Sequence, residues 1–235
     1  MISQRLLKLG ITNGVLTIFS SLIGVISMLL LAYLLPVDEF GKLQYLLAIV
    51  AILSVLSLPG IDIATTQNLS RRAYGSYYYG SAIKFTFTTV VTFIIYFVSG
   101  STIFDGFYGI IISILFCCSF ALTNWKSYFV ANEKLLFISI IEILIKLGSL
   151  FLYVLMRKVS DVSVEQVILI ILGLPAVVNI ILSMFVFTKT KTNKSVEKGF
   201  VKYGLSVSFF SLFNVLANHI EKLLLGYSFG LEDIA

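Results

Sequence analysis

One apolar segment, residues 135–156, carries polar side chains on what would be a single helical face. These side chains are Ser139, Glu142, Lys146, Ser149 and Tyr153. They follow one another at spacings of 3, 4, 3 and 4 residues, which is the spacing of neighbours along one side of an α-helix. A carboxylate can hold a proton or a cation, and an ammonium group can hold an anion. The chemistry that this stripe offers is therefore the binding of an ion or of a charged ligand.

Glu142 and Lys146 are the charged members of this stripe. At about 1.5 Å of rise per residue they lie about 11 Å and about 17 Å into the segment, near the midplane of a bilayer about 30 Å thick. A single charge at that depth costs about 2.5–3.5 kcal/mol. Because a glutamate four residues before a lysine is the favourable order on a helix, the two can partly neutralise each other. Two interpretations stay open: an internal ion pair that tolerates burial, or two charges that line a wet cavity.

Three more segments carry small or polar residues at helical spacing. They are Asn13, Thr17, Ser20, Gly24 and Ser27 in residues 9–35, Gly173, Ala176, Asn179 and Ser183 in residues 166–187, and Ser211, Asn214, Asn218 and Glu221 in residues 203–229. Such residues either join helices in a dry interface or line a polar path. We retain four of them, with the five residues of the first stripe, as candidate cavity residues: Asn13, Asn214, Asn218 and Glu221. Glu221 lies on its polar stripe, whereas its neighbour Lys222 is explained by snorkelling to the membrane surface.

The composition explains why these few polar residues matter. Of the 235 residues, 58% are hydrophobic and 12% are charged, whereas a soluble domain carries about 25% charged residues. The apolar segments cover about 9–35, 43–63, 84–104, 107–125, 135–156, 166–187 and 203–229. Each approaches or exceeds the length of about 20 residues that a membrane-spanning helix needs, and none alternates as barrel strands do. The sequence predicts an all-α integral membrane protein.

Lysine and arginine residues are distributed unevenly between the two sides of these segments. Twelve, including Lys84 and Lys126, fall on the side of the N-terminus, and three fall on the other. Cytoplasmic loops carry the excess of positive charge, so we expect a multi-pass protein with a cytoplasmic N-terminus. The net charge of +5 then follows from topology and needs no nucleic acid. Beside the Pro59-Gly60 break, Asp62 is expected to cap the cytoplasmic end of the second helix.

A cluster of tyrosines precedes the third apolar segment. Its members are Tyr74, Tyr77, Tyr78 and Tyr79. They lie among Arg71, Arg72 and Lys84. Aromatic and basic residues gather where a helix meets the membrane surface, so we expect these tyrosines in an interfacial belt.

The two ends of the chain repeat each other. Residues 8–41 align without a gap on residues 202–235, with nine identities that include "LLLAY" over "LLLGY". The second copy comes six segments after the first, an even step, so the two run in parallel, as in transporters whose halves are related by an axis along the membrane normal. We expect an N-lobe of six helices in residues 1–198 and the first helix of a second lobe in residues 199–235. The chain would then be part of a protein of about twelve helices; a single seven-helix domain is the rival interpretation.

The sequence resembles the polysaccharide (O-antigen/capsule) flippases of the MOP/MATE-like exporter superfamily. The resemblance rests on "LLPVDEFGKLQYLLAIVAILSVLSLPGIDIATTQNLSRR", "ANEKLLFISIIEILIK" and "EKLLLGYSFGLEDIA". It implies a MATE-like fold of two lobes facing a central cavity in a bacterial inner membrane. It also implies a function: flipping an undecaprenyl-pyrophosphate-linked oligosaccharide from the cytoplasmic to the outer leaflet by alternating access, with a polysaccharide polymerase and chain-length machinery as partners.

The resemblance also suggests roles for individual residues. Lys146 would meet the phosphate or saccharide charge, and Glu142 would tune that lysine or carry a coupling ion, either H⁺ or Na⁺. Glu221 matches the acidic position of the family.

No catalytic residue, metal or cofactor is expected. Cys117 and Cys118 are adjacent, which offers no metal-ligand spacing and suits a packing role. The alternatives are a MATE-type cation-coupled drug antiporter and a membrane glycosyltransferase or polymerase. The enzyme is disfavoured because the short loops hold no Asp-x-Asp or His/Cys cluster.

Overall fold

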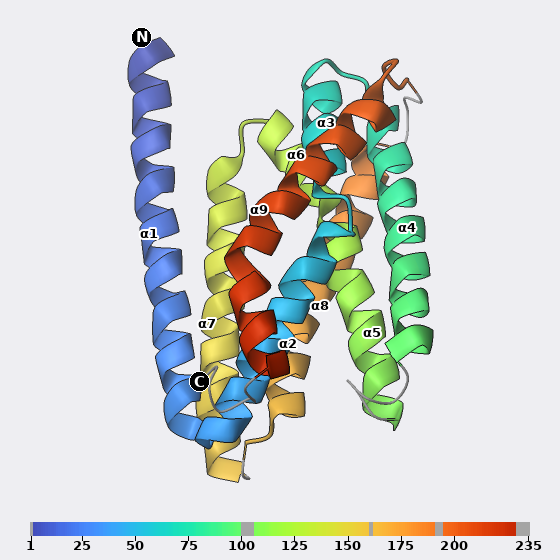
Figure 1. Ribbon diagram of the computed structural model, residues 1–235. Helices are drawn as coiled ribbons and strands as arrows, with labels where there is room; N and C mark the ends of the chain where they lie inside the picture. Colours follow the sequence, from blue (N-terminus) through green and yellow to red (C-terminus); the bar gives the residue numbers. More distant parts are fainter. Residues whose placement is uncertain (1, 100–105, 160–161, 191–194, 229–235) are drawn as a thin grey trace.

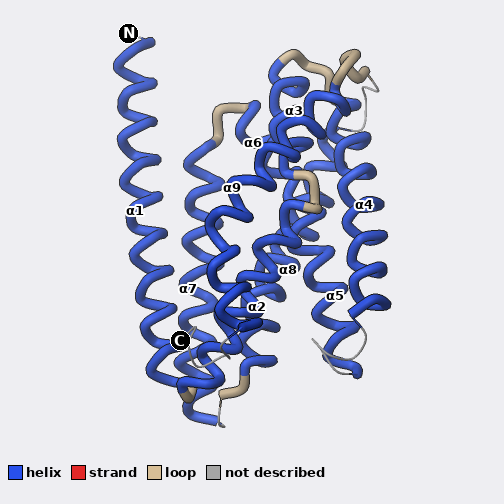
Figure 2. Tube along the Cα trace, in the orientation of Figure 1, coloured by secondary structure: helices blue, strands red, loops and turns tan. Residues whose placement is uncertain are grey.

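The computed structural model describes residues 2–99, 106–159, 162–190 and 195–228. They form a bundle of helices without any strand within those ranges (Figures 1 and 2). The elements are α1 (Ile2–Leu34), α2 (Val37–Val55), α3 (Pro59–Ser70), α4 (Gly75–Ser99), α5 (Gly106–Ala121), η2 (Leu122–Asn124), α6 (Trp125–Ala131), α7 (Leu135–Val159), α8 (Val164–Thr190) and α9 (Phe200–Ser228).

Five stretches of the described residues are long and apolar enough to cross a membrane. They are Gly10–Leu34, Gly109–Ala131, Leu135–Arg157, Val164–Thr190 and Phe200–Glu221. The pair α2 and α3 passes the same test as one span bent by 45°. The prediction of an all-helical, multi-pass membrane chain is confirmed at this level.

The second predicted helix is broken in the middle of the bundle. Leu58 has φ 58° and ψ 61°, a left-handed conformation in which a side chain is strained. Pro59 then begins α3, where a proline without an N–H is tolerated. The helix resumes after the break and ends at Ser70, beyond the expected limit of residue 63. Asp62 therefore lies in the first turn of α3 and does not cap the end of a helix.

Two other helix boundaries differ from those predicted. The third helix, expected at 84–104, begins at Gly75, and residues 100–104 lie outside the described residues. This earlier start carries Tyr77 into the interior, where it is fully buried and packs on Phe187. Tyr79 remains 58% exposed, but the burial of Tyr77 means that the expected interfacial belt does not include every tyrosine. The fourth helix continues past residue 125 through η2 and α6.

Buried apolar residues form two main clusters at opposite ends of the bundle. One joins the ends of α1, α2, α7 and α8 and includes Leu31, Leu43, Tyr153 and Ile168. The other surrounds Trp125. α1 stands at one edge of the bundle and packs along α7 (Figure 1). Only 17% of its most apolar stretch is buried within the bundle. This suits a helix whose remaining surface faces lipid.

The connections alternate between the two ends of the bundle. The links from α3 to α4 and from α6 to α7 lie at the end where α1 begins, and the α1–α2 link lies at the other (Figure 1). Arg71, Arg72 and Lys134 therefore share an end with the start of α1. This arrangement agrees with the predicted alternation of loops.

Candidate functional site

A polar cavity lies at the break between α2 and α3. Its volume is about 450 Å³. α2 and α3 contribute one wall, the junction of α5, η2 and α6 contributes a second, and α9 contributes the third. The lining residues are Ser54, Val55, Ser57, Pro59, Asp62, Phe120, Thr123, Lys126, Ser211, Asn214 and Val215. Two charged groups thus face a cavity that hydroxyl and amide side chains also line.

Asp62 on the wall of this cavity holds a buried lysine. Lys84 Nζ lies 2.7 Å from both carboxylate oxygens of Asp62 and 2.6 Å from Thr123 Oγ1. Thr123 Oγ1 in turn donates to Asp62 Oδ2 at 2.9 Å. The Lys84 side chain is fully buried, whereas Asp62 is 25% exposed. All three ammonium donors of Lys84 are satisfied, as a charge removed from solvent requires.

The first turn of α3 is a favourable place for this carboxylate. The amino end of a helix carries a partial positive charge that stabilises an acidic side chain nearby. Ser127 Oγ donates to the backbone carbonyl of Asp62 at 2.8 Å, so α6 also fixes its position. Asp62 is thereby held by three neighbouring elements, α4, η2 and α6.

Lys126, the second charge of the cavity, pairs with Glu142. The distance from Lys126 Nζ to Glu142 Oε1 is 2.7 Å, and the side chains are 38% and 43% exposed. The ammonium group also lies 5.8 Å from the centre of the Trp125 ring. Because both side chains remain partly open, the ammonium group can exchange its partner for another anion.

Polar side chains from α8 fix the junction that carries Thr123 and Lys126. Trp125 Nε1 donates to Asn179 Oδ1 at 2.8 Å, and Asn179 Nδ2 donates to the carbonyl of Ser119 at 2.7 Å. Ser183 Oγ donates to the carbonyl of Leu122 at 2.9 Å. The predicted stripe of Asn179 and Ser183 therefore joins helices and does not line the cavity.

α9 closes the cavity by a close approach to α3. The backbone N–H of Gly60 donates to Ser208 Oγ at 2.9 Å. A Cβ atom at Gly60 would overlap the carbonyl oxygen of Gly204. Nearer the end of the bundle, Gln67 Nε2 donates to Tyr203 Oη at 3.0 Å. The glycines let the two backbones meet as small residues do between membrane helices.

No protein-family model, curated protein or solved structure matches the chain.

Among the candidate cavity residues of the first stripe, none lines the cavity, and Glu142 alone bonds to a residue that does, Lys126. Lys146 Nζ donates to the carbonyl of Ser20 on α1 at 3.0 Å. Glu142 and Lys146 therefore do not form an ion pair with each other, which was one of the two open interpretations, because their side chains reach different neighbouring helices. Ser149 Oγ donates to the carbonyl of Ile145, as hydroxyl groups within a helix often do.

Tyr153 and Asn13 also lie away from the cavity. Tyr153 is 2% exposed and belongs to an apolar cluster with Leu31 and Val164. Asn13 Oδ1 accepts a hydrogen bond from Ser139 Oγ at 2.6 Å, which places both residues in the interface between α1 and α7.

On α9, the three candidates divide between the cavity and the surface. Asn214 lines the cavity, whereas Asn218 and Glu221 are exposed.

The residues that sequence reasoning missed are Asp62, Lys84 and Lys126, because the lysines were counted among loop charges and Asp62 as a cap. Without these two lysines, the excess of basic residues still falls on the side of the N-terminus. A usable signal was present, since Lys84, Thr88, Ser81 and Tyr77 recur at helical spacing on one face of α4.

Proposed function

We propose that the chain belongs to a membrane transporter that moves an anionic, lipid-linked oligosaccharide across a bilayer by alternating access. The cavity at the α2–α3 break is the observation that carries this proposal. Transporters commonly bind their substrates where a helix is interrupted and half-helix ends face a cavity. A glycan and its phosphates need such a polar path, while the lipid tail can stay in hydrocarbon.

Lys126 is the cavity group that favours an anion in the substrate, since the Asp62 carboxylate is already paired with Lys84. Lys126 offers an ammonium group, and the amino end of α3 adds a partial positive charge. Glu142 neutralises Lys126 until a phosphate of the substrate replaces the carboxylate. Lys126 thereby takes the role that the sequence suggested for Lys146, because it is Lys126 that lines the cavity.

The resemblance to polysaccharide flippases supplies the remainder of the proposal. The substrate is an undecaprenyl-pyrophosphate-linked oligosaccharide that is flipped to the outer leaflet for O-antigen or capsule synthesis. The protein resides in a bacterial inner membrane with its N-terminus in the cytoplasm. Residues 1–198 form the N-lobe of a MATE-like fold, and α9 begins the second lobe. A polysaccharide polymerase is the expected partner, and the protein itself is not an enzyme.

A cation-coupled drug antiporter is the second candidate. The carboxylates of Asp62 and Glu142 favour it, since one lines the cavity and the other is bonded to Lys126. A carboxylate that is open to a cavity can hold a drug cation or a coupling ion. The antiporter and the flippase differ in the phenotype that each predicts.

The test replaces Lys126 by alanine in the native gene, with Lys146→Ala as the matched control. The loss of a hydrogen bond to a charged group is expected to reduce export of surface polysaccharide by about tenfold in Lys126→Ala. Lipid-linked glycan should accumulate in the cytoplasmic leaflet, and Lys146→Ala should export nearly as the wild type does. Normal export after deletion of the gene, together with a change in drug susceptibility, would favour the antiporter.

A further inference from the structure

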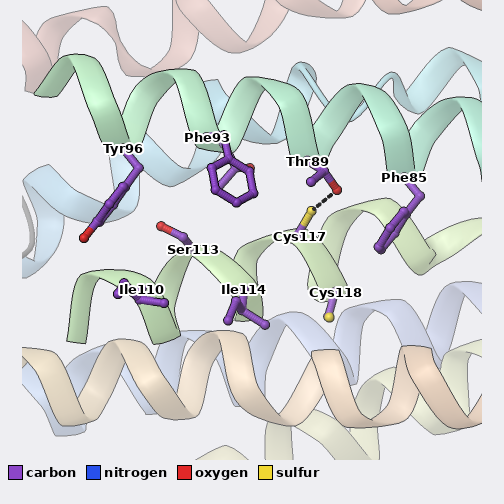
Figure 3. A pocket seen from close by; sticks show the side chains of 10 residues that line it. Phe85, Thr89, Phe93, Tyr96, Ile110, Ser113, Ile114, Cys117 and Cys118 are labelled. Atoms are coloured by element: carbon purple, nitrogen blue, oxygen red, sulfur yellow. Dashed lines mark hydrogen bonds between the residues drawn. The ribbon is translucent and has the colours of Figure 1, made fainter. Parts of the chain in front are cut away.

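A second hollow, which we name the α4–α5 groove, lies between these two helices at the edge of the bundle opposite α1 (Figure 1). Its volume is about 320 Å³. Figure 3 shows the side chains that line it, among them Phe85, Phe93 and Tyr96 of α4 and Ile110, Ile114 and Cys118 of α5.

The groove is suited to hydrocarbon. Two of its hydroxyl groups already have partners within the protein: Thr89 Oγ1 lies 3.2 Å from Cys117 Sγ, and Thr92 Oγ1 donates to the carbonyl of Thr88 at 2.7 Å. An apolar ligand would therefore leave neither of these hydroxyl groups unpaired, which avoids the usual cost of burying polar groups.

The groove opens to the outside of the bundle. Phe85, Phe93, Ile110 and Ile114 are between 46% and 59% exposed. α5 belongs to the apolar span Gly109–Ala131, so an outward opening at this depth faces lipid tails and not water. The occupant must come from within the membrane.

The groove suits a slender chain better than a helix from a partner protein. A helix with its side chains is about 10–12 Å wide. A slender, flexible chain fits this space, whereas a second helix would lie over its mouth without filling it.

The groove and the polar cavity are adjacent along the same helices. Cys117 lines the groove and Phe120, one turn further along the chain, lines the cavity. On α4, Phe85 of the groove follows Lys84, which holds Asp62 at the cavity wall. A molecule with its charged head in the cavity would thus find an apolar site for its chain close by.

We propose that the α4–α5 groove binds a section of the polyisoprenoid chain of a lipid whose charged head enters the cavity. The proposal rests on the function proposed above. It adds a site for the lipid portion, on the outer face of the bundle, to the site for the head group. The aromatic rings of Phe85, Phe93 and Tyr96 contact the methyl branches of the chain.

Photolabelling of the purified protein in phospholipid vesicles tests this site. The probe is a polyprenyl phosphate with a photoactivatable diazirine in its chain, and the labelled residues are located by mass spectrometry. We expect label on the groove residues of α4 and α5 in excess over the exposed face of α8. A phosphatidylglycerol with a diazirine in its acyl chain serves as the comparison. Equal labelling of the groove by both probes would mean ordinary bilayer lipid and would overturn the proposal.

A variant that fills the groove tests the same site independently. Ser113→Phe places a ring among the lining side chains, and Ile181→Phe, at a 59% exposed position of α8, is the control. Overpacking a filled site should lower groove labelling about tenfold in Ser113→Phe and leave it unchanged in Ile181→Phe. Thr92→Phe fills the groove from the opposite helix and serves if Ser113→Phe does not fold. Undiminished labelling in whichever variant folds would contradict the proposal.

The labelling assay requires no transport, so the two proposals can fail separately. Chain labelling confined to the groove, in a protein whose deletion leaves polysaccharide export normal, would retain the groove and remove the flippase. Wild-type export by a folded Ser113→Phe variant would remove the groove as a site of function and leave the flippase intact.

Discussion

Asp62 and Lys84, which are 22 residues apart in the chain, form a bidentate ion pair with both Nζ–Oδ distances at 2.7 Å. The pair joins the first turn of α3 to the middle of α4, with the lysine wholly inside the protein. A buried pair of this kind adds little net stability over apolar residues, but breaking it leaves an uncompensated charge. It therefore determines the position of the half-helix that faces the cavity.

Replacement of Lys84 by methionine should destabilise the protein strongly. Asp62 would lose its counter-ion, and loss of one partner of a buried pair costs about 3–5 kcal/mol. Thermal unfolding of the purified protein in detergent measures the effect. The double variant Asp62→Asn/Lys84→Met removes both charges and should recover most of the loss. If the double variant were as unstable as the single one, uncompensated charge would not be the cause.

Thr123→Val should weaken the same network without changing its charge. The hydroxyl group accepts from Lys84 and donates to Asp62, and valine has a similar shape without either bond. We expect a loss of about 1–3 kcal/mol. Thr66→Val is the control, because the hydroxyl of Thr66 bonds only to the backbone of its own helix in the described structure. Equal stability of the two variants would contradict this account.

Gly60→Ala should disturb the contact between α3 and α9. The new methyl group would meet the backbone of Gly204, which cannot move aside as a flexible side chain would, and overpacking of this kind costs about 1–3 kcal/mol. Gly14→Ala has open space around it and should be neutral or stabilising by up to about 1 kcal/mol. Thermal unfolding of the two variants distinguishes the cases; a neutral Gly60→Ala would show that the helices do not need this approach.

The contact between Asn13 and Ser139 should allow α1 to be cross-linked to α7. With Cys117 and Cys118 replaced by alanine, cysteines at positions 13 and 139 should be joined by a short bifunctional thiol reagent. The oxygens of the native pair lie 2.6 Å apart. A cysteine at 144, where Leu144 is 57% exposed, replaces the one at 139 in the control and should not react with position 13. Equal yields from both pairs, read as a mobility shift in gel electrophoresis, would place α1 differently.

The membrane character of this protein follows from its sequence alone. Whether a run of 20 residues is apolar enough to enter lipid is a local property, because each residue contributes its own transfer free energy. The break at Pro59 is local too, since proline lacks the N–H that a continuing helix needs. For the same reason the segments, their helical nature and the excess of basic residues on one side were accessible without a structure.

The partners of the charged residues were decided only by the tertiary structure. Spacing along one helix predicts Lys146 as the partner of Glu142, yet Glu142 bonds to Lys126 of α6 and Lys146 reaches α1. Lys84 looked like a loop charge until α4 was seen to begin at Gly75 and to turn this side chain inward. Such contacts depend on how each helix is rotated and tilted against its neighbours. That arrangement is set by the sum of many packing interactions between helices distant in sequence, which no single segment encodes.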